Sequence, residues 1–269
     1  MPATRPITPR VLQDRLASLA QELSARDDAL ALLALGSVGI ETGRLDAWSD
    51  LDFFVVVRDG AKDRYIGTLD WLAAAYPLAW HFQNTVDGHK ALMADGVFCE
   101  FAVFETDELS RIPYAPGRFI WRRSEVDEAL AYAKQPLPAR HNSAWLVGEA
   151  LSNLIIGLQR LARGEKLAAM RMIQVDSLDR VLELLELQQP RPDDSCPARD
   201  PFSIDRRIEM RSTEAALALP TWASGYEQTA PAALALLAAL EAHTVVPAAV
   251  AEHIRMLAKM AGQLSHGDA

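Results

Sequence analysis

Apolar residues change their spacing near residue 136, so the chain divides into two halves of different character. In the first half, short β-type runs alternate with segments whose apolar residues recur at a helical period. After the linker Gln135-Pro136-Leu137-Pro138, the β-prone runs end and long helical patterns follow. The pattern predicts a mixed α+β fold class, with an α/β domain over 1–135 and an all-helical domain over 136–269.

Turn signals place the individual elements within this plan. Asp59-Gly60 ends the β-prone run 51–57, and the Asp-Gly pairs at 87–88 and 95–96 separate further β-prone runs, which is typical of a small meander of strands. The pattern predicts strands over 30–35, 51–57, 78–86, 89–93 and 97–104, and helices over 10–26, 62–76, 144–163, 166–187, 203–219, 232–243 and 247–264.

Composition narrows the class of protein. Half of the 269 residues are apolar, and 27 Lys and Arg against 36 Asp and Glu give a formal charge of −9. This balance favours a globular protein and argues against a general nucleic-acid binder, which needs a basic surface. The apolar runs 29–40 and 230–240 are shorter than the roughly 20 residues of a membrane-spanning helix. With only Cys99 and Cys196, and no signal-peptide pattern in the first ten residues, a cytoplasmic location is expected.

The first candidate for chemistry is the pair Gly36-Ser37, at the point where a strand ends and a short helix is expected to begin. Glycine lets the backbone approach a ligand closely, while a serine hydroxyl and the N–H groups of a helix start suit a phosphate. Gly-Ser is also a common turn pair, so this feature alone favours an ordinary turn.

Three carboxylates are more informative. Asp50 and Asp52 are two residues apart at the start of a strand, so both side chains point to the same face. Two like charges this close need compensation, and a divalent cation such as Mg²⁺ provides it well. Glu100 interrupts another apolar strand, where a lone carboxylate is costly. If the two strands are neighbours, the three acids form a cluster for two metal ions, or for one metal ion and a general base.

Gly36-Ser37, the later Asp50-Leu51-Asp52 and a carboxylate on a following strand together resemble the polymerase-β-type nucleotidyltransferase superfamily. The segment 36–54, with Phe98-Cys99-Glu100-Phe101 and the helical second half, is most similar to the lincosamide nucleotidyltransferases. The motifs cover roughly residues 30 to 105 and agree in order and spacing.

This resemblance implies a defined reaction, in which a substrate hydroxyl attacks the α-phosphorus of an NTP and pyrophosphate leaves. It implies that the backbone at Gly36 and Ser37 holds the terminal phosphates. Asp50 and Asp52 would bind Mg²⁺, two ions in all, with ATP as the favoured NTP. Glu100 would ligate the second metal ion or accept the hydroxyl proton, and its length favours the role of base.

Other charged residues have more than one interpretation. Arg44 can contact a phosphate or form a surface ion pair with Glu41 or Asp46, and Lys90 is a candidate triphosphate contact. Trp48 directly precedes Ser49-Asp50 and is a candidate for lining the cleft. Five further candidates are favoured as solvated surface charges: Arg118, Arg122, Arg123, Glu149 and Glu165. For Arg206, Arg207 and Arg211, which are expected on one helix, a solvated face and ion pairs between subunits are equally good explanations.

The sequence is compatible with more than one class of acceptor substrate. The expected partners are an NTP and a small-molecule acceptor, which is a lincosamide, an aminoglycoside or another metabolite. A catalytically idle nucleotide-binding module is the alternative from another class, although the retention of Gly36-Ser37, Asp50, Asp52 and Glu100 argues against it. Alanine-rich helices near the C-terminus also suggest a homodimer.

Overall fold

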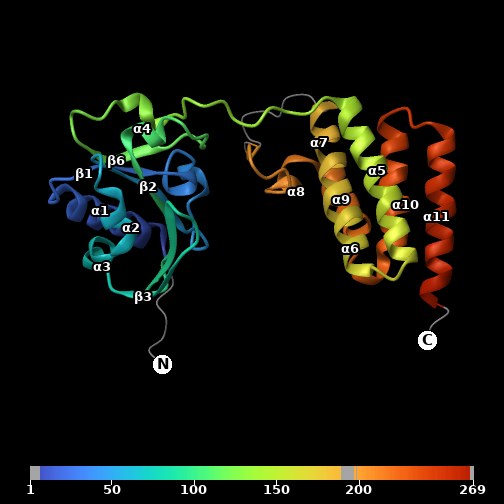
Figure 1. The fold of residues 1–269 in the computed structure, drawn as a ribbon, viewed down its shortest axis with the longest axis horizontal. Helices are drawn as coiled ribbons and strands as arrows, with labels where there is room; N and C mark the ends of the chain where they lie inside the picture. The colour runs from blue at the N-terminus through green and yellow to red at the C-terminus, as the bar shows by residue number, and fades with distance from the viewer. Residues whose placement is uncertain (1–6, 189–196, 198, 267–269) are drawn as a thin grey trace. The chain divides into compact units, whose positions relative to one another are not determined.

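A computed structural model of the chain describes residues 7–188, 197 and 199–266. The chain separates into two compact units, Met1–Leu137 and Pro138–Ala269 (Figure 1). The described part of the first unit combines a mixed sheet with short helices, and that of the second unit consists of helices and loops. The predicted mixed fold class is therefore confirmed.

Six strands form one sheet in the first unit, in the order β3-β4-β5-β2-β1-β6. β2 and β5 pair in parallel, while every other neighbouring pair is antiparallel. The parallel pair is central, so both of its strands are covered on their edges. The strands are β1 (Ala29–Ala34), β2 (Leu51–Val57), β3 (Leu78–Gln83), β4 (Gly88–Met93), β5 (Phe98–Glu105) and β6 (Arg118–Arg122).

The two faces of the sheet bury different side chains, because successive residues of a strand point to opposite faces. On one face, Phe53 and Phe101 stack with their ring centroids 5.2 Å apart and pack with helices α1 (Pro9–Ser24) and α3 (Asp70–Ala75). On the other face, Phe54 and Phe104 meet edge to face at 5.0 Å. A second apolar cluster surrounds this pair at the C-terminal ends of β2 and β5.

The helix predicted over 62–76 is interrupted in the structure. It forms two short helices, α2 (Lys62–Gly67) and α3, with Thr68 between them in an extended conformation. Gly67 is a weak helix former, and the break lets the buried Trp71 indole donate a hydrogen bond to the Tyr65 carbonyl at 3.1 Å. Short helical segments complete this unit: η1 (Gly36–Val38), η2 (Thr42–Arg44), α4 (Thr106–Leu109) and η3 (Glu128–Ala131).

The second unit is a helical bundle around one apolar core. The helix expected over 166–187 contains a π-helical segment, η4 (Met172–Ser177), and the helix expected over 203–219 is divided at Ser212. Gly157 allows the close packing at the π-helical segment, since a Cβ there would lie 2.6 Å from Ile173. The helices are α5 (Ser143–Ala162), α6 (Lys166–Arg171), α7 (Leu178–Gln188), α8 (Ile208–Arg211), α9 (Thr213–Trp222), η5 (Tyr226–Gln228), α10 (Thr229–His243) and α11 (Ala248–His266).

None of the helices in the described ranges combines the length and the apolar character needed to cross a bilayer. Cys99 is buried in the sheet core, and burial raises the pKa of its thiol to about 12. The prediction that Cys99 belongs to the core is thus confirmed, whereas Cys196 lies outside the described residues.

Candidate functional site

A tight turn follows β1 and contains Gly36 and Ser37. Gly36 has a φ of +53°, which L side chains rarely adopt, and η1 begins at this residue. The Gly39 N–H donates to the Leu35 carbonyl at 2.9 Å, which closes the turn. The structure therefore places the Gly-Ser pair where a strand passes into a short helical turn.

Asp52 lies directly against this turn. The Leu35 N–H donates to the Asp52 carbonyl at 2.8 Å, which joins the end of β1 to the start of β2. A Cβ built on Gly36 would lie 3.5 Å from the Asp52 Oδ2 atom. That distance is an ordinary van der Waals contact, so it is the positive φ of Gly36 that would strain a larger residue at this position.

Glu100 is the neighbour of Asp52 across the parallel pair, since the two residues are direct partners in the register of β2 and β5. Partners in parallel strands point to the same face of the sheet. Asp50 comes immediately before β2, two residues from Asp52. The condition that the two acid-bearing strands are neighbours is therefore met.

A cation and an amide hold Glu100 in place. Lys90 on β4 is the register partner of Glu100 on its other side, and its Nζ lies 3.1 Å from Glu100 Oε2. The Asn84 side-chain amide donates to Glu100 Oε1 at 3.5 Å. Lys90 is a candidate triphosphate contact from the sequence, and the structure gives its charge a carboxylate partner within the sheet.

Two residues between the turn and β2, Arg44 and Trp48, were candidates for phosphate binding and for lining a cleft. Arg44 forms an ion pair with Glu41, which is the surface alternative to phosphate binding. Trp48 is 93% exposed and packs against little of the described chain, so it does not line a cleft formed by the first unit.

The carboxylates fit a metal site that a substrate completes. Within the described residues, no group of three His, Cys, Asp or Glu side chains is arranged to hold a metal ion by itself. The donor set at the sheet is instead a pair of hard oxygen ligands beside a turn. Mg²⁺ is commonly bound in this way, by one or two carboxylates together with the phosphates of a substrate.

Sequence patterns did not identify the role of Arg118. Its Nε and Nη2 atoms donate to the carbonyls of Gly39 and Val38 at 3.0 and 3.1 Å. Gly117 permits this approach, because a Cβ there would lie 2.7 Å from the Ala34 carbonyl oxygen. The only sequence signal was a basic cluster around residues 119–121, and solvent exposure was the favoured interpretation of it.

The neighbouring arginines also bind the backbone. Arg122 donates to the Val126 carbonyl at 3.1 Å and pairs with Glu128. Arg123 donates to the Ala29 and Arg26 carbonyls at 2.8 and 2.9 Å. These two side chains thus stabilise the edge of the sheet.

In the helical unit, Glu149 and Glu165 are exposed, as expected of surface carboxylates. Arg206 forms a surface ion pair with Asp200 at 2.8 Å. Arg211, in contrast, is 3% exposed and pairs with Glu186 at 2.9 Å, so it belongs to the interior. Of the two explanations expected for Arg211, the solvated helix face is therefore wrong, and the ion pair that the structure shows lies within the chain.

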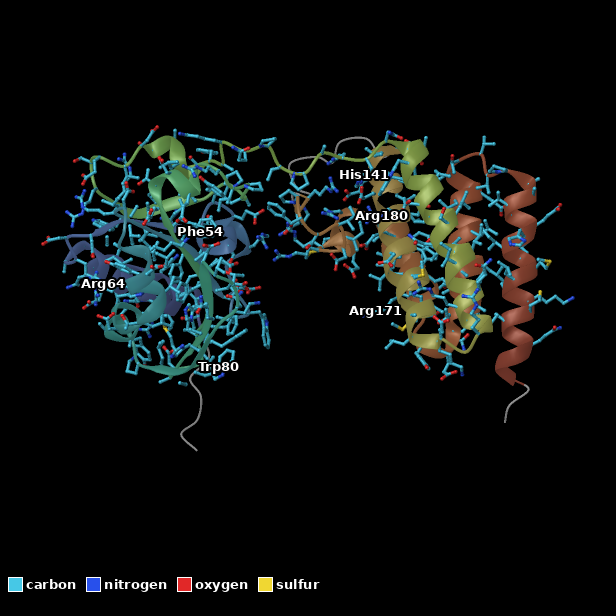
Figure 2. All side chains as sticks on the ribbon, viewed as in Figure 1. Phe54, Arg64, Trp80, His141, Arg171 and Arg180 are labelled. Carbon is cyan, nitrogen blue, oxygen red and sulfur yellow. The ribbon has the colours of Figure 1, made fainter. Side chains whose placement is uncertain are left out.

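A cavity of about 370 Å³ lies near the start of the helical unit and is lined by His141, Asp179, Arg180 and Glu183 among others. Figure 2 labels two of these residues, His141 and Arg180. Burial raises the pKa of Asp179 to about 6, and the nearby acids Asp205, Asp176 and Glu183 add to this shift. Arg180 and Glu183 pair at 2.9 Å. Sequence patterns did not predict this cavity.

A second, larger cavity of about 1110 Å³ lies along α10 and α11. Apolar residues such as Leu234 and Ala258 line it, together with the ion pair of Arg255 and Glu241 at 2.6 Å. Both cavities have the size of small-molecule sites.

No protein-family model and no curated protein matches the chain. An aminoglycoside 6-adenyltransferase from Bacillus subtilis superposes with a TM-score of 0.34 and 10% identity, over 97% of this chain and 99% of that one. A nucleotidyltransferase-like protein from Exiguobacterium sibiricum 255-15 also gives 0.34, with 9% identity over 86% of this chain and 74% of its own. At these TM-scores the superpositions assign neither a family nor a substrate to this chain.

Proposed function

We propose that the protein is a nucleotidyltransferase that moves a nucleoside monophosphate from an NTP to a hydroxyl group of a small molecule. The observation that carries this proposal is the position of Asp52, which lies against the Gly36 turn and is the register partner of Glu100. A close-approach turn and two adjacent carboxylates are what a metal-bound triphosphate requires.

In this proposal, the backbone at Gly36 and the Ser37 hydroxyl bind the terminal phosphates. Asp50 and Asp52, with Glu100, would hold Mg²⁺, which when bound offsets the negative charge of the phosphates. The acceptor oxygen forms a bond to the α-phosphorus while the bond from the α-phosphorus to the bridging oxygen breaks, and pyrophosphate leaves. Glu100 would accept the proton that the hydroxyl loses, or would act as a metal ligand.

The pairing of Glu100 with Lys90 supports a defined geometry for that proton transfer. Lys90 offsets the charge of Glu100 and fixes one of its oxygens, while Asn84 contacts the other. A base must be held within hydrogen-bond reach of the proton it removes. We infer that Lys90 positions Glu100 and that the phosphate contact first expected of Lys90 is secondary.

The helical unit is proposed to bind the acceptor. Its cavity at His141, Asp179 and Glu183 offers acids and an aromatic wall, since the His141 ring stacks on Trp145 with centroids 3.7 Å apart. These groups suit an acceptor with hydroxyl or amino groups, such as a lincosamide or, as the second candidate, an aminoglycoside. Exposed apolar side chains on α10 and α11, including Leu234, Met256 and Met260, support a homodimer as a further proposal.

The test is an assay of the full chain with Mg²⁺, each NTP in turn, and panels of lincosamides and aminoglycosides. Pyrophosphate release and an acceptor mass increased by one nucleoside monophosphate are the expected results. Nucleotide binding without release, with every acceptor, would instead favour the non-catalytic nucleotide-binding module.

A further inference from the structure

The side chain of Arg118 reaches from β6 to the turn after β1 and contacts two of its carbonyls. Nε donates to the Gly39 oxygen at 3.0 Å, and Nη2 donates to the Val38 oxygen at 3.1 Å. These carbonyls belong to the two residues that directly follow Ser37. The guanidinium group therefore lies beside the proposed phosphate site while the residue remains exposed.

The charge of Arg118 distinguishes it from the other cations near the site. Arg44 is paired with Glu41, and Lys90 is paired with Glu100. Within the ranges that the structure describes, the hydrogen bonds of the Arg118 side chain go to carbonyl oxygens, and no ion pair is formed. Carbonyl dipoles orient a guanidinium group without neutralising it, so a full positive charge remains at the turn.

The geometry of the guanidinium group leaves donors for a ligand. Arginine carries five N–H donors in a planar fork, of which the two carbonyls use two. The remaining donors include both of those on Nη1. Because guanidinium groups bind phosphate oxygens with paired N–H donors, a polyphosphate is the ligand that matches both the charge and the donors.

We propose that Arg118 binds the terminal phosphates of the nucleotide and at the same time positions the turn that carries Ser37. This inference rests on the proposed function, since it names a further residue of that site. Two donors fix the turn in the conformation that Gly36 permits, and the others bind phosphate oxygens. The residue thus links the edge strand β6 to the nucleotide site.

The test compares Arg118→Gln and Arg118→Lys with Arg122→Gln, a matched control that removes the same charge from the same strand. Each full-length variant is titrated with inorganic tripolyphosphate, an NTP and the corresponding nucleoside. We expect Arg118→Gln to weaken binding of tripolyphosphate and NTP by about tenfold or more and to leave nucleoside binding unchanged. Arg118→Lys should retain part of the affinity, and Arg122→Gln should bind as the wild type.

A distorted turn would also weaken the binding of tripolyphosphate and NTP, because the turn itself is proposed to bind the phosphates. An equal loss of affinity in Arg118→Gln and in Arg118→Lys, which retains the positive charge, would therefore overturn the phosphate contact. NMR of the wild-type chain gives a second measurement that does not depend on variant folding, because tripolyphosphate should shift the Arg118 Nε–H and Gly39 amide signals. Unshifted signals at saturating tripolyphosphate would contradict the inference.

The two proposals can fail separately. Tripolyphosphate binding at Arg118 without nucleotidyl transfer to any acceptor would support the anion site and reject the proposed enzyme. Transfer that proceeds with unchanged NTP affinity in Arg118→Gln would support the enzyme and reject the role of Arg118.

Discussion

The two ends of one sheet face contrast sharply within the first unit. At the C-terminal ends of β2 and β5, Phe54, Val56 and Phe104 pack into an apolar cluster. At the N-terminal ends of the same strands, Asp52 and Glu100 stand side by side, with Lys90 on the next strand. We call these the packed end and the charged end.

One pair of strands therefore carries an apolar cluster at one end and the proposed site at the other. The packed end fixes the strands by burying aromatic side chains, which resist displacement. At the charged end, Asp52 and Glu100 keep a constant separation, because they are partners in the parallel register that the packed end holds rigid. Substitutions at one end that leave the other end unchanged therefore test this difference between the two ends.

The largest effect is expected from Asp52→Asn. Removing this charge from beside the Gly36 turn should lower turnover by about 10⁴-fold, since a metal-bridged phosphate contributes several kcal/mol. Steady-state pyrophosphate release measures the change. Asp59→Asn, in the exposed turn that follows the same strand, is the control and should retain its activity. Comparable activity in Asp52→Asn and the control would reject the charged end as the active site.

Glu100→Gln should lower turnover by about 10³-fold while NTP binding stays within a few fold of the wild type, because a general base acts on the acceptor proton. Single-turnover kinetics and equilibrium NTP titration separate the two quantities. Loss of NTP binding in parallel with turnover would assign Glu100 to the metal ion instead. A fully active variant would eliminate both roles.

At the packed end, Phe104→Ala should lower the free energy of unfolding by about 3 kcal/mol, because the 6% exposed ring leaves a cavity beside Phe54. Turnover per folded molecule should change by less than about threefold, since the ring lies about 13 Å along the strand from Glu100. Urea unfolding and active-site titration measure the two effects.

The matched control is Phe82→Ala on the edge strand β3, where the ring is 43% exposed and lies beside Trp80. Trp80 is labelled in Figure 2. We expect a cost below about 1 kcal/mol for this substitution. Equal costs at Phe104 and Phe82 would remove the distinction between the packed and exposed aromatic positions.

The smallest effect concerns Asp179, a half-buried carboxylate with Arg180 and three acids, Asp205, Asp176 and Glu183, nearby. The pKa of Asp179 is raised from 3.8 to about 6, chiefly by burial. The folded state therefore keeps a proton that the unfolded state releases, so this contribution to stability is complete below pH 4 and is lost as the pH rises to about 6. After screening, the loss is about 1–2 kcal/mol.

Asp179→Asn should remove that pH dependence and make the protein more stable than the wild type at pH 8. Chemical denaturation at pH 4.5 and pH 8 provides the measurement. Glu149→Gln, on an exposed helix surface, is the control. An unchanged pH slope in Asp179→Asn would show that another group is responsible.

The strands and turns of the first unit could be predicted from the sequence, because alternating apolar residues and turn residues determine them. The apolar run over 51–57 identified a central strand, and its spacing placed Asp50 and Asp52 on one face. That Glu100 lies beside Asp52 was only a condition in the sequence, and the register of the two strands meets it. Turn pairs such as Asp95-Gly96 marked the meander correctly, because a positive φ at Gly96 requires such a residue.

The features that the sequence did not predict depend on contacts between residues that are far apart along the chain. Arg118 and Gly39 are 79 positions apart, so no local periodicity reports their hydrogen bond. The π-helical segment at 172–177 follows from tertiary packing, in which the buried Gln174 side chain accepts from the Gly225 N–H and donates to the Gly225 carbonyl, both at 2.8 Å. Arg211 was misassigned for the same reason, since the partner that draws it into the interior is Glu186.

The parallel pairing of β2 and β5 also has a kinetic consequence. Parallel neighbours cannot be joined by a tight hairpin, and here the connection contains α2, α3 and the β3-β4 hairpin. Asp52 and Glu100 are separated by 100 − 52 = 48 positions, so a long loop must close before they become neighbours. Loops of this kind form late and slowly compared with local hairpins. During refolding, recovery of nucleotide binding should therefore lag behind the first appearance of helical signal.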